Sequence, residues 1–194
     1  MGRLQRSFFG RPTLTVAREL LGKSIVKLES SGDLLSATIV EVEAYIGETD
    51  LACHARHGRT QRNQVMFGPP GIAYVYFIYG MYWMFNIVTE HDGFPAAVLL
   101  RSVLPTEGIE KMRQRRARPD PELSNGPAKI TQAFGIGPAY NGYDLCAPSA
   151  DFFLEDTGER LQMNGYETLI RVGIGSTPEP WGEMTWNYRL SGLT

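Results

Sequence analysis

The first part of the chain changes from a helical to an extended pattern of apolar residues. After Pro12, the apolar side chains Leu14, Val16, Leu20 and Leu21 recur at helical spacing, and Gly22 stands where a helix commonly ends. Residues 23–30 and 34–45 then flank the sequence Ser-Gly-Asp at 31–33, which is typical of a turn between two strands. These patterns predict a helix after Pro12, followed directly by a β-hairpin.

The middle of the chain predicts more strands, preceded by a long loop. Residues 72–80, 81–90 and 95–105 are rich in β-branched and aromatic residues, and "HDGF" offers a turn between the last two segments. Residues 48–71 are polar and basic and contain glycine and proline. They predict a long ordered loop, and loops of this length inside compact domains are often functional.

The second half of the chain predicts two helices and some short strands. One helix is expected from Pro105 through Ala117, and another has Pro127 at its first position and Gly135 at its end. The strand-like pieces beyond this helix are residues 151–155 and 167–175. The expected fold is a single α+β domain, residues 1–194, built around an antiparallel sheet.

The composition agrees with a globular domain. The chain has 194 residues, of which 43% are hydrophobic and 21% charged. Its longest apolar stretch, residues 72–88, is too polar for a membrane helix, and its first residues lack the apolar run of a secretory signal. We therefore expect a cytoplasmic protein with no membrane partner. The two cysteines are too few for a disulfide framework or a four-cysteine zinc site.

The basic residues are concentrated in two segments. The net charge of -2 argues against general coating of nucleic acid, but "HARHGRTQR" at 54–62 and "KMRQRRAR" at 111–118 contain no acidic residue. Either segment could meet phosphates or could be ordinary solvated surface.

A strand that ends at residue 45 carries the first candidate for chemistry. Alternation places Glu41, Glu43 and Tyr45 on one face of this strand. Charged residues are mostly exposed, so a plain strand with a polar outer face fits the same pattern. The pattern alone does not separate Glu41 from Glu43.

Two other kinds of site are disfavoured by the residues that follow. Ligand types for a metal gather at Glu48, Asp50, Cys53, His54 and His57, but the chain has no HExxH motif and only one other histidine. A nucleophilic Cys53 beside His54 is also disfavoured, because neighbouring residues on an extended chain point to opposite faces. We expect no metal and no cofactor.

The aromatic residues of the predicted sheet form a third candidate. Tyr74 and Tyr76 share one strand face, and Phe77 and Tyr79 share the other. Aromatic residues usually belong to a sheet core. So many tyrosines next to basic loops also fit a surface that stacks nucleic-acid bases, either in an enzyme or in a non-catalytic binding module.

Several ordered motifs together resemble one known family. The segment "IVEVEAYIGETDLACHARHGRTQRNQVMFGPPGIAYVYFIYGMYWMFNIV", followed by "AVLLRSVLP", "GIEKMRQRR" and "NGPAKITQAFGI", resembles the alkyladenine (3-methyladenine) DNA glycosylase family. The resemblance is strong over residues 11–137 and weaker in the tail, which includes "LIRVGIG" and "WNYRLSG".

The resemblance implies a fold and an activity. The fold is a curved antiparallel sheet with surrounding helices and a protruding β-hairpin that enters DNA. The activity is excision of damaged purines, such as 3-methyladenine, 7-methylguanine and hypoxanthine, which are flipped out of double-stranded DNA before the N-glycosidic bond is hydrolysed. The implied partner is DNA containing such lesions, and we expect the protein to act as a monomer.

The resemblance also implies a role for individual residues. Glu43 corresponds to the general base that activates water, which leaves Glu41 as a structural or neighbouring acid. The implied base pocket consists of Tyr45, His54, Tyr76 and Asn86; the hairpin tip that fills the gap in the duplex consists of Tyr79, Met81 and Tyr82; and the implied DNA or water contacts are Arg101 and Ser191. Apart from the resemblance, Lys129 stands at the start of the expected helix from Pro127, where it could hold a phosphate or belong to a plain surface helix. The pocket motifs contain no lysine that could form a Schiff base, so we expect hydrolysis without strand cleavage.

Overall fold

One large antiparallel sheet organises the protein. The computed structural model describes residues 2–158 and 165–192. The sheet has nine strands in the order β1-β7-β2-β3-β6-β5-β4, and β9 pairs with both β3 and β8. The strands are β1 (Gly2–Arg3), β2 (Ser24–Leu28), β3 (Leu34–Ile46), β4 (Ala73–Ile78), β5 (Tyr82–Val88), β6 (Ala96–Glu107), β7 (Phe152–Asp156), β8 (Tyr166–Leu169) and β9 (Asn187–Leu190). The expected α+β class with an antiparallel sheet is confirmed.

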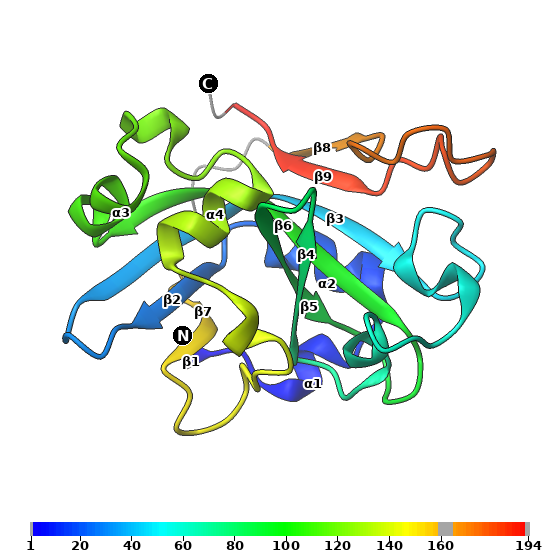
Figure 1. The fold of residues 1–194 in the computed structure, drawn as a ribbon, viewed down its shortest axis with the longest axis horizontal. Helices are drawn as coiled ribbons and strands as arrows, with labels where there is room; N and C mark the ends of the chain where they lie inside the picture. The colour runs from blue at the N-terminus through cyan, green and yellow to red at the C-terminus, as the bar shows by residue number, and fades with distance from the viewer. Residues whose placement is uncertain (1, 159–164, 193–194) are drawn as a thin grey trace.

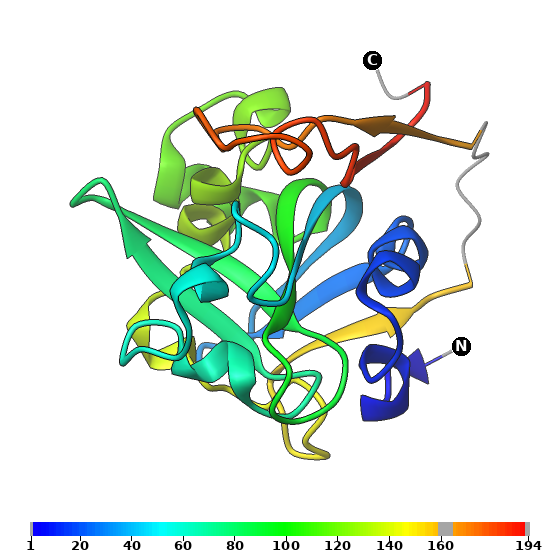
Figure 2. The same cartoon turned by 90° about the vertical axis from the view of Figure 1, so that its right-hand side faces the viewer.

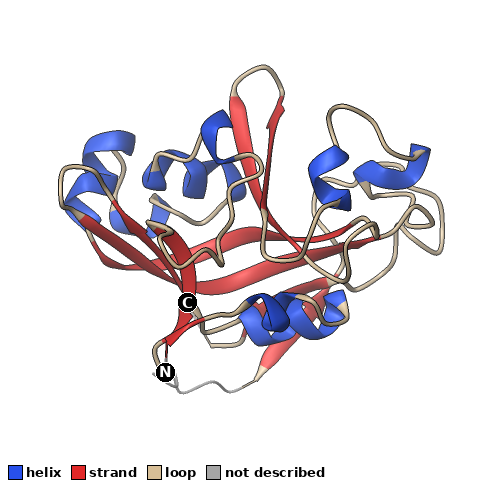
Figure 3. Ribbon diagram, turned by 90° about the horizontal axis from the view of Figure 1, so that it is seen from below, coloured by secondary structure: helices blue, strands red, loops and turns tan. Residues whose placement is uncertain are grey.

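Helices cover both faces of the sheet (Figure 3). The α-helices are α1 (Arg6–Phe9), α2 (Thr13–Leu20), α3 (Ile109–Arg116) and α4 (Pro127–Phe134), and the short 3₁₀ helices are η1 (His54–His57), η2 (Gln64–Phe67), η3 (Asp120–Glu122) and η4 (Pro138–Tyr140). Helix α2 packs on β3 and β6, whereas α4 packs on β5 and β6 (Figure 1). Val16, Ala17 and Leu20, on the inner face of α2, are fully buried in the main core.

The centre of the sheet is irregular where β3 changes its neighbour. Over residues 34–38 β3 pairs with β2, and over residues 41–43 it pairs with the distant strand β9. Its pairing with β6 shifts twice around Glu41, so that Val40 on β3 and Arg101 on β6 are each left without an opposite residue. Such bulges re-aim side chains. Here the bulge lies beside the two glutamates that the sequence analysis singled out.

Most of the expected elements are present. The helix after Pro12, the hairpin of β2 and β3, the strands β4, β5 and β6, and the helix from Pro127 are confirmed. Gly135 ends α4 in a left-handed conformation, with φ of 62°. The loop of residues 48–71 is ordered and contains η1 and η2.

The expected start of the third helix at Pro105 is wrong. Strand β6 continues to Glu107, and α3 begins only at Ile109. Proline is tolerated here because β5 pairs with β6 only as far as Leu99, so this part of β6 has one open edge. The chain turns at Gly108, whose φ is 69° and whose close approach to Leu35 leaves no room for a Cβ atom.

The tail differs more from expectation. Strand β8 ends at Leu169, so the expected strand over residues 167–175 is wrong in its second half. Beyond Leu169 the chain turns inward and Arg171 is buried, which ends the pairing. Strand β9 was not expected at all. Among the helices of the described ranges, none is long and apolar enough to cross a membrane.

Candidate active site

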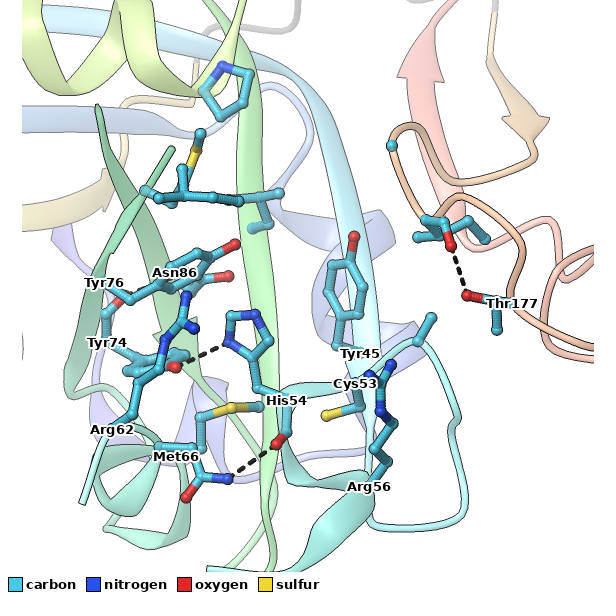
Figure 4. A pocket seen from close by; sticks show the side chains of 18 of the residues that line it. Tyr45, Cys53, His54, Arg56, Arg62, Met66, Tyr74, Tyr76, Asn86 and Thr177 are labelled. Atoms are coloured by element: carbon cyan, nitrogen blue, oxygen red, sulfur yellow. Dashed lines mark hydrogen bonds between the residues drawn. The ribbon is translucent and has the colours of Figure 1, made fainter. Parts of the chain in front are cut away.

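A cavity of about 640 Å³ opens between the long loop, the β4–β5 hairpin and the tail. Its walls come from segments far apart in the sequence, and Figure 4 shows side chains from β3, β4, η1 and the tail converging on it. The lining residues include Tyr45, Ala52, His54, Arg56, Arg62, Tyr76, Tyr79, Asn86, Leu99, Arg101, Val172 and Thr177. The four residues expected to form a base pocket, Tyr45, His54, Tyr76 and Asn86, therefore line one cavity.

The His54 ring is fixed by two tyrosines. Its Nδ1 atom lies 2.9 Å from the hydroxyl of Tyr74, with which it shares a hydrogen bond. Its ring packs edge-on against Tyr76, with 4.4 Å between centroids. Burial, followed by the charges of Arg62 and Arg56, lowers the pKa of His54 to about 4. At neutral pH His54 is an uncharged wall of the cavity.

Asn86 and Tyr76 complete the aromatic side of the cavity. Asn86 is buried on β5, and its Nδ2 atom donates to the backbone oxygen of Tyr74 at 3.1 Å, which fixes the amide. Burial raises the pKa of Tyr76 to about 12, so its phenol stays neutral. Neutral aromatic rings such as these suit contact with a nucleobase.

Glu43 lies directly behind the cavity wall. Its side chain has no exposed surface. Oε2 accepts hydrogen bonds from the Tyr45 hydroxyl at 2.9 Å and from Arg101 Nη1 at 3.3 Å. Oε1 accepts from the backbone nitrogen of Val172 at 2.6 Å and from Asn187 Nδ2 at 3.2 Å. Tyr45, Arg101 and Val172 line the cavity, so three of the four donors separate Glu43 from it.

Arg101 connects the two glutamates of β3. It is the residue that the β6 bulge leaves unpaired, and its guanidinium contacts Glu41 Oε1 through Nε at 3.2 Å and Glu43 Oε2 through Nη1 at 3.3 Å. Burial first, and then the charge of Glu43, raise the pKa of Tyr45 well above its usual range. Tyr45 therefore stays protonated and donates to Glu43.

The tail segment that meets Glu43 is anchored by a buried ion pair. Arg171 Nη1 lies 2.6 Å from Asp50 Oδ2, and neither side chain is exposed. Arg171 also donates to the backbone oxygens of Ala44 and Trp181, and its guanidinium lies 4.9 Å from the centre of the Tyr45 ring. The pair joins the long loop, β3 and the tail next to Val172.

The hairpin tip is exposed. Tyr79 has 74% of its surface accessible and lines the mouth of the cavity, whereas Met81 is 62% exposed and does not line it. Tyr82 is half-buried and lies outside the lining as well. Tyr79 and Gly80 both have positive φ angles, 54° and 67°, as a tight hairpin turn requires. Figure 2 shows this hairpin extending away from the body of the molecule at the left.

Lys129 and Ser191 do not reach the cavity. Lys129 lies in the first turn of α4, where its Nζ atom donates to Asn125 Oδ1 at 2.7 Å. Ser191 follows β9, and its backbone nitrogen donates to the oxygen of Gly165. Neither residue lines the cavity, so their DNA contacts stay predictions.

The two basic segments differ in how their charges are used. In the segment 111–118, Lys111, Arg113 and Arg115 each form an ion pair with an acidic residue from elsewhere in the chain. In the segment 54–62, Arg56 and Arg62 are exposed and line the cavity. The segment 54–62 therefore offers more positive charge to a ligand of the cavity than the segment 111–118.

The alternative sites gain no support. Cys53 is fully buried, and its burial raises the pKa of the thiol to about 12, so it is no nucleophile at neutral pH. Within the described part of the chain, no three His, Cys, Asp or Glu side chains are placed to hold a metal ion. Asp50, one of the candidate ligands, is occupied by Arg171.

Comparison with known proteins decides the family. Residues 7–193 match the family model described as Methylpurine-DNA glycosylase (MPG). The chain belongs to the methylpurine-DNA glycosylase family. It is 51% identical over 193 residues to a protein of Chlorobaculum tepidum, which covers 99% of this chain and 89% of that one. It is 48% identical over 183 residues to a protein of Chlorobaculum parvum, and the match covers 93% of this chain and 86% of that protein. Both carry the name "Putative 3-methyladenine DNA glycosylase".

Membership of the methylpurine-DNA glycosylase family establishes the coarse function. The protein is a DNA glycosylase of base excision repair, and DNA is its substrate. The resemblance deduced from the motifs is thereby confirmed.

The structure adds residues to this glycosylase site that the sequence analysis did not select. They are Asn187, Val172 and the pair of Asp50 and Arg171, which all act around Glu43. The sequence indicates Asp50 only as one of several ligand types for a disfavoured metal site. The motif "LIRVGIG" was noticed as a weak match, but nothing in its local pattern indicated that Arg171 is buried.

Proposed function

We propose that this DNA glycosylase flips damaged purines from duplex DNA into the cavity and hydrolyses their N-glycosidic bond with water activated by Glu43. The single observation that carries the proposal is the position of Glu43. It is a fully buried carboxylate, and its Oε2 atom is shared with Tyr45 and Arg101 on the wall of an aromatic cavity.

The contact between Arg101 and Glu43 is the place for the attacking water. Arg101 lines the cavity, and its 3.3 Å contact with Glu43 is longer than the contacts from the other two lining donors, Tyr45 at 2.9 Å and Val172 at 2.6 Å. Water that enters from the cavity can therefore displace this contact more easily than those two. Glu43 then takes a proton from this water while the water oxygen bonds to C1′ of the sugar and the C1′–N bond breaks. The negative charge beside the sugar also stabilises its oxocarbenium character.

The aromatic walls favour lesions with a flat ring and a weakened glycosidic bond. We propose 3-methyladenine, 7-methylguanine and hypoxanthine as substrates. The cationic N-alkylated bases leave readily, whereas hypoxanthine is neutral and needs a proton donor. Asn86 is held by Tyr74, so it can crowd the exocyclic amino group of undamaged guanine. Tyr79 at the exposed hairpin tip can fill the gap left in the duplex.

The same site supports hydrolysis without strand cleavage. Among the described residues that line the cavity there is no lysine to form a Schiff base with the sugar. The proposed product is a free base and an intact strand with an abasic site. We further propose that the protein works as a cytoplasmic monomer.

A duplex that contains a single hypoxanthine tests the proposal. Incubation followed by alkali is expected to cut the strand at the lesion, and incubation without alkali is expected to leave the strand intact. Binding without any alkali-sensitive site would instead indicate a non-catalytic binding module. Loss of activity in EDTA would indicate a metal-dependent hydrolase.

A further inference from the structure

The two glutamates of β3 share a neutral partner on β9, a strand that is distant in sequence but pairs with β3. Asn187 is fully buried on β9, opposite Glu43 in the strand register. Its Nδ2 atom donates to Glu41 Oε1 at 2.8 Å and to Glu43 Oε1 at 3.2 Å. Because both contacts are to carboxylate oxygens, the chemistry fixes the amide with its nitrogen toward the glutamates.

This arrangement leaves the other end of the amide unused. Oδ1 of Asn187 is buried and has no hydrogen-bond partner among the described residues. A buried acceptor without a donor costs stability, so the side chain is poorly explained by packing alone. Its amide nitrogen, however, donates to both Glu41 and the proposed base Glu43.

We propose that Asn187 is a positioning residue that selects which oxygen of Glu43 faces the cavity. Together with the backbone nitrogen of Val172, it occupies Oε1. This leaves Oε2 for Tyr45, Arg101 and the incoming water. The proposal rests on Glu43 being the base of the proposed function.

The charges around Glu43 explain why a neutral donor is needed. Glu41 on β3 carries a like charge, and Arg101 on β6 is the one cation in direct contact with both carboxylates in the described part of the chain. The remaining titratable neighbours are Tyr45, which is protonated, and Arg171, which is paired with Asp50. The amide bridges Glu41 and Glu43 without adding charge, so it reduces their repulsion.

Single-turnover excision of hypoxanthine from duplex DNA, measured across pH, tests this role. The variant Asn187→Leu has a similar size and removes both donor hydrogens. We expect its rate at neutral pH to fall about tenfold. We also expect the acid limb of its rate–pH profile to move to higher pH by about one unit, because the carboxylates repel each other more. Its affinity for damaged DNA is expected to stay close to that of the unmodified protein.

Three further variants make the test specific. Asn187→Asp keeps the shape of the side chain and adds a third carboxylate, so the acid limb of its rate–pH profile is expected to move further to higher pH. If Asn187→Leu does not fold, the result for Asn187→Asp decides the test. Adding Glu41→Gln to Asn187→Leu removes the repelling charge and is expected to move the limb back. Arg189→Lys, in the same strand with an exposed side chain paired to Glu167, is the control and is expected to change neither rate nor profile.

The outcomes separate this proposal from the one on which it depends. If Glu43→Gln abolishes excision and both Asn187 variants keep the original acid limb, the positioning role is wrong and Glu43 stays the base. A lower rate with an unmoved limb would reduce Asn187 to a packing residue. If Glu43→Gln itself excises normally, the proposed base is wrong.

Discussion

Asp50 and Arg171 form an ion pair with no exposed surface, although 121 residues separate them in the chain. Asp50 also accepts hydrogen bonds from the backbone nitrogens of Ile46 and Ala52. Ala52 lines the cavity, and Arg171 directly precedes Val172, which donates to Glu43. One buried pair therefore holds two separate walls of the site.

Replacing Asp50 by asparagine is expected to weaken both the fold and the activity. The substitution keeps the shape but leaves Arg171 as an uncompensated buried charge, which costs about 3–5 kcal/mol. Urea denaturation measures the loss. The control is Glu167→Gln, because Glu167 pairs with Arg189 at the surface and its loss costs less than about 1 kcal/mol. Equal stability losses in the two variants would contradict the anchoring role of Asp50.

The stability of the protein is expected to depend on His54 in mildly acidic solution. Its pKa is about 4 in the folded protein, below the usual 6.5, so the unfolded chain binds a proton first as the pH falls. The contribution of His54 to the free energy of unfolding is therefore complete above pH 6.5. As the pH falls from 6.5 to 4, the free energy of unfolding decreases by up to about 1.4 kcal/mol per pH unit.

The variant His54→Asn isolates this contribution. It lacks the titrating ring, so its free energy of unfolding is expected to fall less steeply than that of the unmodified protein between pH 6.5 and 4. His91→Asn is the control, because His91 is exposed and outside the cavity. Parallel curves for the protein and for His54→Asn would show that His54 is not held neutral.

Tyr79 at the hairpin tip is expected to lower the stability of the fold while supporting excision. Tyr79 has a positive φ of 54°, which is unfavourable for any residue with a Cβ atom. Tyr79→Gly is expected to stabilise the protein by about 1 kcal/mol in urea denaturation, because only glycine relieves this strain. Tyr79→Ser keeps the strain and serves as the matched variant.

Both Tyr79 variants are expected to lose the wedge. They should excise hypoxanthine more slowly from duplex DNA, where a gap must be filled, than from single-stranded DNA, where there is none. Normal excision from duplex DNA by Tyr79→Ser would exclude the wedge role.

The parts of the fold that the sequence predicted are those with local causes. Helix α4 was predicted because Pro127 and Gly135 mark its ends, and the β2–β3 hairpin because a turn separates two strand patterns. The continuation of β6 through Pro105 was missed because it depends on a bulge and on an open strand edge. Neither feature is visible in the neighbouring residues.

The residues of the site also divide into those that motifs in the sequence indicate and those that depend on distant strand pairing. Motif resemblance selected Tyr45, His54, Tyr76 and Asn86, and these residues do line one cavity. Asn187 could not be selected, because its relation to Glu43 depends on β9 pairing with β3 across 144 residues. The burial of Glu43 could not be read from alternation either, since its face of the strand is covered by the tail.

The most direct test of the account is the variant Glu43→Gln, with excision and binding measured on the same hypoxanthine-containing duplex. Glutamine keeps the size of the side chain but cannot take a proton from water. We expect single-turnover excision to fall about 100-fold or more, with the affinity for damaged DNA retained. An unchanged excision rate would contradict the central claim that Glu43 activates the water.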